Sequence, residues 1–178
     1  AGTCGPAPQG DTCLDPFVIP SSPASLSGDT SDFFGELGYG PGDCPGMSLG
    51  WGAGSKDVVY AFEPEVQDLY TLTLDASFDS TLYVLTDCSD VAASCIVADD
   101  QHPSNESVDL WMYPGTTYFI VVDGYGNQSN VEGSYTLSLT SACVPQCKLK
   151  ECGPDGCGGT CGECEGFSVC SDEGLCTS

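Results

Sequence analysis

The chain has 178 residues and a net charge of −23, with 26 acidic residues against only 3 lysines and arginines. A chain of this length holds one medium domain and at most a small second one. Because so few cations can neutralise phosphates, the composition excludes nucleic-acid binding. Such an acidic surface suits high salt, divalent cations or simple colloidal solubility.

Thirteen cysteines are the second constraint. At this density, and without a long helical pattern, they predict disulfides and an oxidising compartment. No apolar run approaches the ~20 residues that a membrane helix needs. The sequence begins at Ala1 without methionine, which is typical of a mature product whose leader has been removed. We therefore expect a secreted or cell-surface protein that does not span a membrane.

The N-terminal part is expected to be irregular. Residues 1–16 are rich in Gly, Pro and Thr, which indicates an extended arm held by cysteines rather than by a core of its own. Short strands are expected at 17–19 and 25–27, separated by prolines as at a sheet edge. The glycine-dense stretch 35–55 predicts a long loop, which Cys44 can staple.

Alternating apolar and polar residues predict the remaining strands. Turn signals recur about every 8–12 residues, the spacing of an all-β sandwich. No segment shows a convincing helical period. The expected strands cover 57–62, 70–75, 81–86, 96–98, 107–113, 117–122 and 133–140.

The strongest strand signal lies between Gly115 and Gly124. From Thr117 to Val122 every residue is aromatic or β-branched and both faces are apolar, which predicts a central strand covered on both sides. Asp123 and Gly124 are expected to end it in a turn, because glycine allows a positive φ. We predict an all-β fold, an antiparallel jelly-roll-like β-sandwich over residues 17–141.

Residues 142–178 differ in composition, with eight cysteines and few large apolar side chains. A segment of ~35 residues cannot bury enough surface to fold without covalent help, so we predict a small disulfide-rich C-terminal module. Cys161 and Cys164 have the two-residue spacing of a zinc or redox pair. The tail has no histidine, and an oxidising compartment favours disulfides.

Two disulfides are predicted in the sandwich. Cys13 is expected to pair with Cys44, holding the arm to the long loop, and Cys88 with Cys95, closing the loop between two strands. The tail cysteines are expected to pair among themselves, in any of 105 connectivities. These are Cys143, Cys147, Cys152, Cys157, Cys161, Cys164, Cys170 and Cys176.

Several motifs occur in a fixed order. They include Gly10-Asp-Thr-Cys13, Lys56-Asp-Val-Val-Tyr60, Phe78-Asp-Ser-Thr-Leu-Tyr-Val84 and Val121-Val-Asp-Gly124. Their order and spacing resemble the bacterial pre-peptidase C-terminal domain of secreted proteins from myxobacteria and related bacteria. The stretch Cys152–Cys164 looks like cysteine-rich modules of the same kinds of protein.

The resemblance implies a β-sandwich that accompanies exported enzymes and surface proteins as a non-catalytic accessory. It also adds support for calcium, which some members of the family bind. No enzyme accompanies the sandwich here, so we expect the sandwich and its tail to be the working part.

Catalysis is not expected. His102 is the only histidine, and it lies in the polar loop 99–103 with no nucleophile elbow before it. We expect an exposed loop residue there. Paired carboxylates carry little information in a chain this acidic. The sequence therefore does not predict an enzyme.

Calcium is the one cofactor that the sequence suggests, because hard oxygen ligands on loops suit it. Asp99, Asp100 and Asp123 lie at the ends of expected strands and form the predicted site. Asp29 and Asp32 form a second group. The alternative is that all of them are solvated aspartates in turns.

Three aromatic residues fall outside the expected core face. Trp51 lies in the glycine-rich loop, and Trp111 and Tyr113 lie on the face opposite Val108 and Leu110. Exposed aromatics can stack on a glycan or bury against a partner subunit. The alternative is that the long loop and the cysteine-rich tail cover them.

We predict a non-catalytic secreted structural or adhesive protein, a subunit of an extracellular surface assembly or filament. Its partners would be further copies of itself or another cell-surface component. A carbohydrate-binding module with a glycan partner is the alternative. Acceptor-type sequons at Asn105 and Asn127 leave glycosylation open.

The number of cysteines generates a prediction for Cys4. Thirteen is odd, so a fully oxidised monomer leaves one cysteine over. The pairs above leave Cys4, which would form an intermolecular disulfide or remain a free thiol. A head-to-tail contact through the arm would build a filament. Non-reducing electrophoresis of native material separates the two: a single monomer band with one titratable thiol would eliminate the covalent link.

Overall fold

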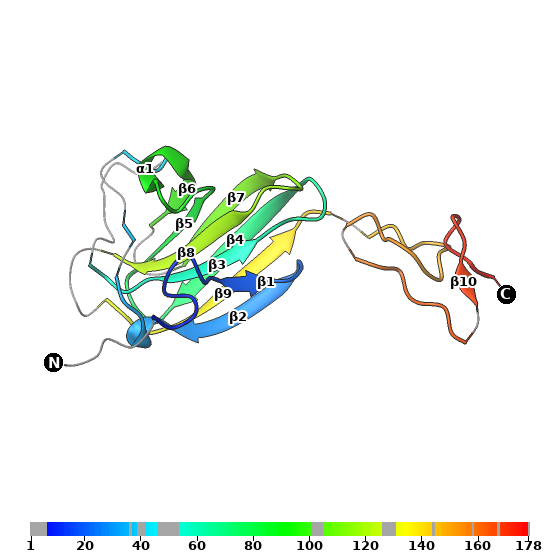
Figure 1. The fold of residues 1–178 in the computed structure, drawn as a ribbon, viewed down its shortest axis with the longest axis horizontal. Coiled ribbons are helices and arrows are strands. Elements are labelled where there is room, and N and C mark those ends of the chain that lie inside the picture. The colour runs from blue at the N-terminus through cyan, green and yellow to red at the C-terminus, as the bar shows by residue number, and fades with distance from the viewer. Residues whose placement is uncertain are drawn as a thin grey trace.

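The structure is a computed structural model that describes residues 7–35, 37–38, 42–45, 54–100, 105–125, 131–143, 145–157, 159–166 and 168–177. Cys4, Trp51, His102 and Asn127 lie outside these residues, so the predictions for them are untested. Figure 1 shows two stacked sheets and a narrow C-terminal segment that extends from one end of them.

The sandwich is all-β, as predicted. One sheet has five strands in the order β1-β3-β8-β5-β6, and the other has four in the order β2-β9-β4-β7. Neighbouring strands are antiparallel except for β1, which runs parallel to β3. The bounds are β1 (Phe17–Ile19), β2 (Ala24–Asp29), β3 (Val58–Phe62), β4 (Asp68–Ala76), β5 (Ser80–Leu85), β6 (Cys95–Asp99), β7 (Glu106–Met112), β8 (Tyr118–Gly124) and β9 (Ser134–Ser141).

Two short helical turns connect these strands. The 3-10 turn η1 (Thr30–Asp32) follows β2, and α1 (Val91–Ser94) lies between β5 and β6. Each begins at an aspartate whose side chain accepts a hydrogen bond from the first turn, the usual N-cap arrangement. Single turns are too short for a periodic signal. In the described part of the chain, no helix has the length and apolar character to cross a membrane.

Strand β8 lies in the middle of the five-stranded sheet and is buried on both faces, as predicted. Tyr118, Ile120 and Val122 point into the main core between the sheets. Val121 points to the opposite face, where it belongs to a smaller apolar cluster with Cys44. The alternation of side chains along this strand therefore serves two separate cores.

The predicted turn at the end of this strand is wrong. Strand β8 continues through Gly124, which is not among the glycines with positive φ. Glycine is required here for another reason, because a Cβ at Gly124 would lie 2.4 Å from the carbonyl oxygen of Val131. Asp123 is a fully buried strand residue that pairs with Thr81.

The predicted disulfide pairing in the sandwich is also wrong. Cys13 bonds to Cys88, and Cys44 bonds to Cys95. The local closure of Cys88 on Cys95 does not form, because each of these cysteines is bonded to a cysteine from a distant part of the chain. The arm is instead fastened to the connection between β5 and β6 at Cys88, and the long loop to the first residue of β6, Cys95.

The C-terminal segment is held by four internal disulfides that overlap along the chain. Its short strands β10 (Val169–Cys170) and β11 (Cys176–Thr177) pair with each other. Disulfides stabilise this segment, whereas a hydrophobic core stabilises the sandwich. The pairs are Cys143–Cys157, Cys147–Cys161, Cys152–Cys170 and Cys164–Cys176.

The two sandwich disulfides should differ in their contribution to stability. They span 75 residues (Cys13–Cys88) and 51 residues (Cys44–Cys95), so loop-closure entropy separates them by only a few tenths of a kcal/mol. Cys44 is also 1% exposed and packs in the smaller core. Replacing Cys44 and Cys95 with alanine should therefore cost about 1 kcal/mol more than replacing Cys13 and Cys88.

Urea unfolding of the two double variants measures this difference. Equal unfolding midpoints and slopes would show that packing around Cys44 contributes nothing beyond the covalent link.

Candidate binding site

The outer face of the four-stranded sheet carries short polar side chains. Apart from Leu69 and Trp111, every outward-facing residue is Ser, Thr or Asp, so the long charged side chains that usually guard exposed strands are absent. This face is called the hydroxyl face below. Its polar members are Ser25, Ser27, Asp29, Thr71, Thr73, Asp75, Ser107, Asp109, Ser134, Thr136, Ser138 and Thr140.

The strand register aligns these side chains in rows. Ser25 pairs with Ser138, Ser138 with Thr73, and Thr73 with Ser107, so one row of hydroxyls crosses all four strands. Neighbouring strands lie ~4.8 Å apart, and successive outward residues on one strand are ~6.7 Å apart. The face therefore presents hydrogen-bonding groups at regular intervals in two directions.

Two hollows lie at one end of the hydroxyl face. One, of ≈ 410 Å³, is lined by Asn105 and Ser107 among others, and the second, of ≈ 420 Å³, by Ser27. The hollows share Asp75 and Thr136 as lining residues. Amide, hydroxyl and carboxylate groups therefore converge at this end.

Trp111 lies at the opposite end of the face. Its side chain is 55% exposed, and it sits across from Leu69 of β4. Tyr113 follows β7 and is 49% exposed. The described residues of the loop and the tail leave both aromatics open to solvent. Trp111 stands four residues from Ser107 along the strand, a separation of ~13 Å.

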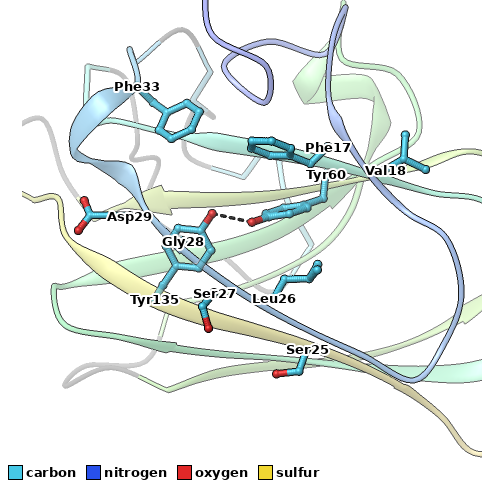
Figure 2. A pocket seen from close by; sticks show the side chains of 10 residues that line it. All are labelled: Phe17, Val18, Ser25, Leu26, Ser27, Gly28, Asp29, Phe33, Tyr60 and Tyr135. Atoms are coloured by element: carbon cyan, nitrogen blue, oxygen red, sulfur yellow. Dashed lines mark hydrogen bonds between the residues drawn. The ribbon is translucent and has the colours of Figure 1, made fainter.

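A different kind of hollow opens between β1 and β2, the edge strands of the two sheets (Figure 2). Its volume is ≈ 410 Å³. At its floor the hydroxyls of Tyr60 and Tyr135 lie 2.7 Å apart in a hydrogen bond, and the ring of Phe17 packs 5.6 Å from that of Tyr60. Gly28 makes room for Tyr135, since a Cβ there would lie 2.4 Å from the tyrosine hydroxyl.

The two phenols at the floor of this edge cleft are not free for a ligand, and its other polar side chains, Ser25, Ser27 and Asp29, belong to the hydroxyl face. Burial raises the pKa of both Tyr60 and Tyr135, so the phenols stay protonated and bond to each other. Prolines at positions 16, 20 and 23 flank β1 and β2, and prolines hinder strand addition at a sheet edge. Binding sites usually need a few free polar groups to orient a ligand, and the hydroxyl face supplies them better.

The predicted calcium residues do not form one cluster. In the sheet register Asp99 pairs with Leu82 and Asp123 with Thr81. Because Thr81 and Leu82 are neighbours in one strand, their side chains point to opposite faces. Asp99 and Asp123 therefore lie on opposite faces of the five-stranded sheet. Asp100 cannot share one calcium ion with both of them.

Of the second predicted group of aspartates, Asp29 and Asp32, the first has a structural role. Asp29 accepts a hydrogen bond from the backbone N–H of Ser31 at 2.9 Å and caps η1. The hydrogen bonds from Ser31 hold the pKa of Asp29 below its usual range. Asp29 and Asp32 are both exposed, which agrees with the alternative of solvated turn residues.

Only one group of described residues brings three candidate metal ligands within reach of a single ion, and it consists of Cys152, Cys164 and Cys170. All three are disulfide-bonded. Disulfide sulfurs are not thiolates and do not serve as zinc ligands.

Sequence reasoning missed that Asp123 is buried. Its carboxylate accepts hydrogen bonds from Ser55 Oγ at 2.8 Å, Tyr83 Oη at 3.2 Å and the backbone N–H of Gly124 at 2.7 Å. Burial first, and then the nearby Asp57, raise the pKa of Asp123 well above its usual range. The available signal was that Asp57 and Asp123 directly adjoin apolar runs in strands.

Glu106 was missed in the same way, although it has the same parity as the inward-facing Val108. It is 1% exposed, and its Oε2 accepts a hydrogen bond from Ser80 Oγ at 2.9 Å. Burial raises its pKa to about 7, with smaller contributions from Asp99 and Asp100, against the effect of Ser80.

No family model and no curated protein sequence matches this chain. Among solved structures, it is similar to the pre-peptidase C-terminal domain of collagenase from Bacillus anthracis, with 16% identity over 76% of this chain and 100% of that chain and a TM-score of 0.48.

Two further solved structures are similar. One is PliG of Aeromonas hydrophila, a periplasmic inhibitor of g-type lysozyme, with 12% identity over 70% of this chain and 94% of that chain and a TM-score of 0.47. The other is a mutant of a carbohydrate-binding module of family 29, with 8% identity over 66% and 92% and a TM-score of 0.27.

Glu106 should make stability depend on pH. The pKa of a glutamate in an unfolded chain is 4.5, and in the folded protein the pKa of Glu106 is about 7. Between these two pH values the native state keeps a proton that the unfolded chain releases. The free energy of unfolding should therefore fall as pH rises from about 4.5 to about 7, by on the order of 3 kcal/mol, and then level off.

Glu106→Gln removes this titration while keeping a polar group beside Ser80. Urea unfolding of both proteins at several pH values isolates the contribution, because the other acids are common to both. Parallel stability curves for wild type and Glu106→Gln between pH 4.5 and 7 would contradict the raised pKa.

Proposed function

We propose that this chain is a non-catalytic adhesive module of a secreted protein, which attaches to carbohydrate through its hydroxyl face. The observation that carries the proposal is Trp111, a 55% exposed indole at the end of a sheet face that, apart from Leu69, bears hydroxyls and carboxylates. An indole face can pack on the apolar face of a sugar ring. Hydroxyls and carboxylates beside it can bond to the hydroxyls of the sugar.

The perturbed acids support a non-catalytic role. A general acid must lie within hydrogen-bond reach of the atom that it protonates. Asp123 and Glu106, whose pKa values are raised, are 0% and 1% exposed. Glu106 borders one of the hollows, but its carboxyl is bonded to Ser80 on the inner side, and Asp123 lies in the other sheet.

The disulfides support secretion. Six of them join the described cysteines, and such a density is typical of proteins in oxidising compartments. The tail then acts as a covalently stapled extension of the sandwich.

A structural subunit that associates with copies of itself is the second candidate. The observation that favours it is the edge cleft, where Val18 of β1 is 70% exposed beside the rings of Phe17 and Phe33. A neighbouring subunit would cover these apolar groups. Sedimentation velocity distinguishes the candidates, since an adhesive module stays monomeric at concentrations where it binds polymer.

The adhesive role predicts that Trp111→Ala abolishes most carbohydrate binding. Affinity electrophoresis in gels that contain neutral polysaccharides should retard the wild type. The variant should bind at least tenfold more weakly, a loss of about 1.4 kcal/mol, because it lacks the stacking surface. Phe34→Ala is the matched control, since Phe34 is 62% exposed but lies off the hydroxyl face.

Unretarded migration of the wild type in every polysaccharide tested would sink the proposal. So would equal retardation of the wild type and Trp111→Ala.

A further inference from the structure

We propose that the hydroxyl face selects an extended, uncharged polysaccharide, which lies from Trp111 across the hydroxyl rows to the hollows at Asp75. The inference rests on the proposed function and names the class of its ligand. It follows from the charge, the dimensions and the stiffness of the face.

Charge selects against an anionic polymer. The charged groups on the hydroxyl face are Asp29, Asp75 and Asp109, all of them carboxylates, and the whole chain carries −23. Ionised carboxylates only accept hydrogen bonds. Sugar hydroxyls can supply the donors, whereas a uronate or sulfate group would be repelled by this field.

The dimensions of the hydroxyl face favour a polymer over a single sugar. Trp111 and Ser107 are ~13 Å apart along β7, and the row from Ser25 to Ser107 crosses four strands, another ~14 Å. Trp111 and the two hollows lie at opposite ends of the face. One sugar ring cannot contact both ends, so only a chain of several sugars uses the whole surface.

Stiffness limits the entropy that binding costs. The threonines of the face are β-branched, and such side chains have few accessible rotamers. Thr71 Oγ1 donates to Asp109 Oδ1 at 2.5 Å, and the hydroxyls of Ser27 and Thr136 lie 3.4 Å apart. A surface that is already ordered loses less freedom on binding, so several individually weak bonds can add up.

The test removes hydroxyls and leaves Trp111 in place. Thr73→Val/Ser138→Val replaces a directly paired Thr and Ser in the middle of the face with side chains that suit strands. Thr86→Val is the control, because Thr86 is exposed but lies outside the face. The probes are galactomannan and hydroxyethyl cellulose as neutral polymers and alginate as a polyuronate, each in affinity electrophoresis at two salt concentrations.

Wild type and Thr86→Val should bind a neutral polymer equally, and the double variant should bind it about tenfold more weakly. Short oligosaccharides should compete better as their length increases, and alginate should not retard any of the proteins at either salt concentration.

Two results would overturn the inference and leave the adhesive role intact. One is retention by alginate as strong as by the neutral polymers. The other is unchanged binding by the double variant while Trp111→Ala loses binding, which would mean that the indole acts without the hydroxyl rows. If no polysaccharide retards the wild type, the proposed function itself fails.

Discussion

Strand β8 has to bury both of its faces, and two different parts of the chain cover them. Ile120 and Val122 are covered by the four-stranded sheet, which any sandwich provides. Val121 and its neighbour Tyr83 need a second cover, which includes the long loop around Cys44. Of the described residues of that loop, Leu37 and Cys44 pack there, and the bond from Cys44 to Cys95 fastens the loop to the sheet. The disulfide and the smaller core therefore depend on each other.

The four-stranded sheet is in the opposite situation. On its inner face, side chains such as Leu72 and Leu74 are completely buried. No described segment covers its outer face. Only this sheet can therefore offer a flat surface to a large ligand. Trp111 occurs on it, whereas Val121 and Tyr83 on the outer side of the other sheet are enclosed. The distribution of covered and open faces places the candidate site.

Local patterns were enough to predict most strands and their inward residues. In β4, β7 and β9 the alternation is clean, because each has one buried and one solvated face. The disulfide partners were not predictable, since spacing along the chain says nothing about which loops cross the same edge of a sheet. Asp123 and Glu106 were missed because acidic residues are almost never fully buried. The hydroxyl rows were also missed, as they depend on register between strands that are distant in sequence.

The near absence of cations connects the surface to the interior. The described sandwich contains one lysine, Lys56, and it is paired with Glu132 at 2.8 Å. Lysine is therefore not available to guard the exposed sheet, and short hydroxyl side chains occupy those positions instead. For the same reason the buried Asp123 and Glu106 are stabilised by hydroxyl donors and by retaining a proton rather than by ion pairs. A chain so poor in lysine and arginine thus presents hydroxyls and carboxylates on its open sheet, and burial raises the pKa of the acids inside it.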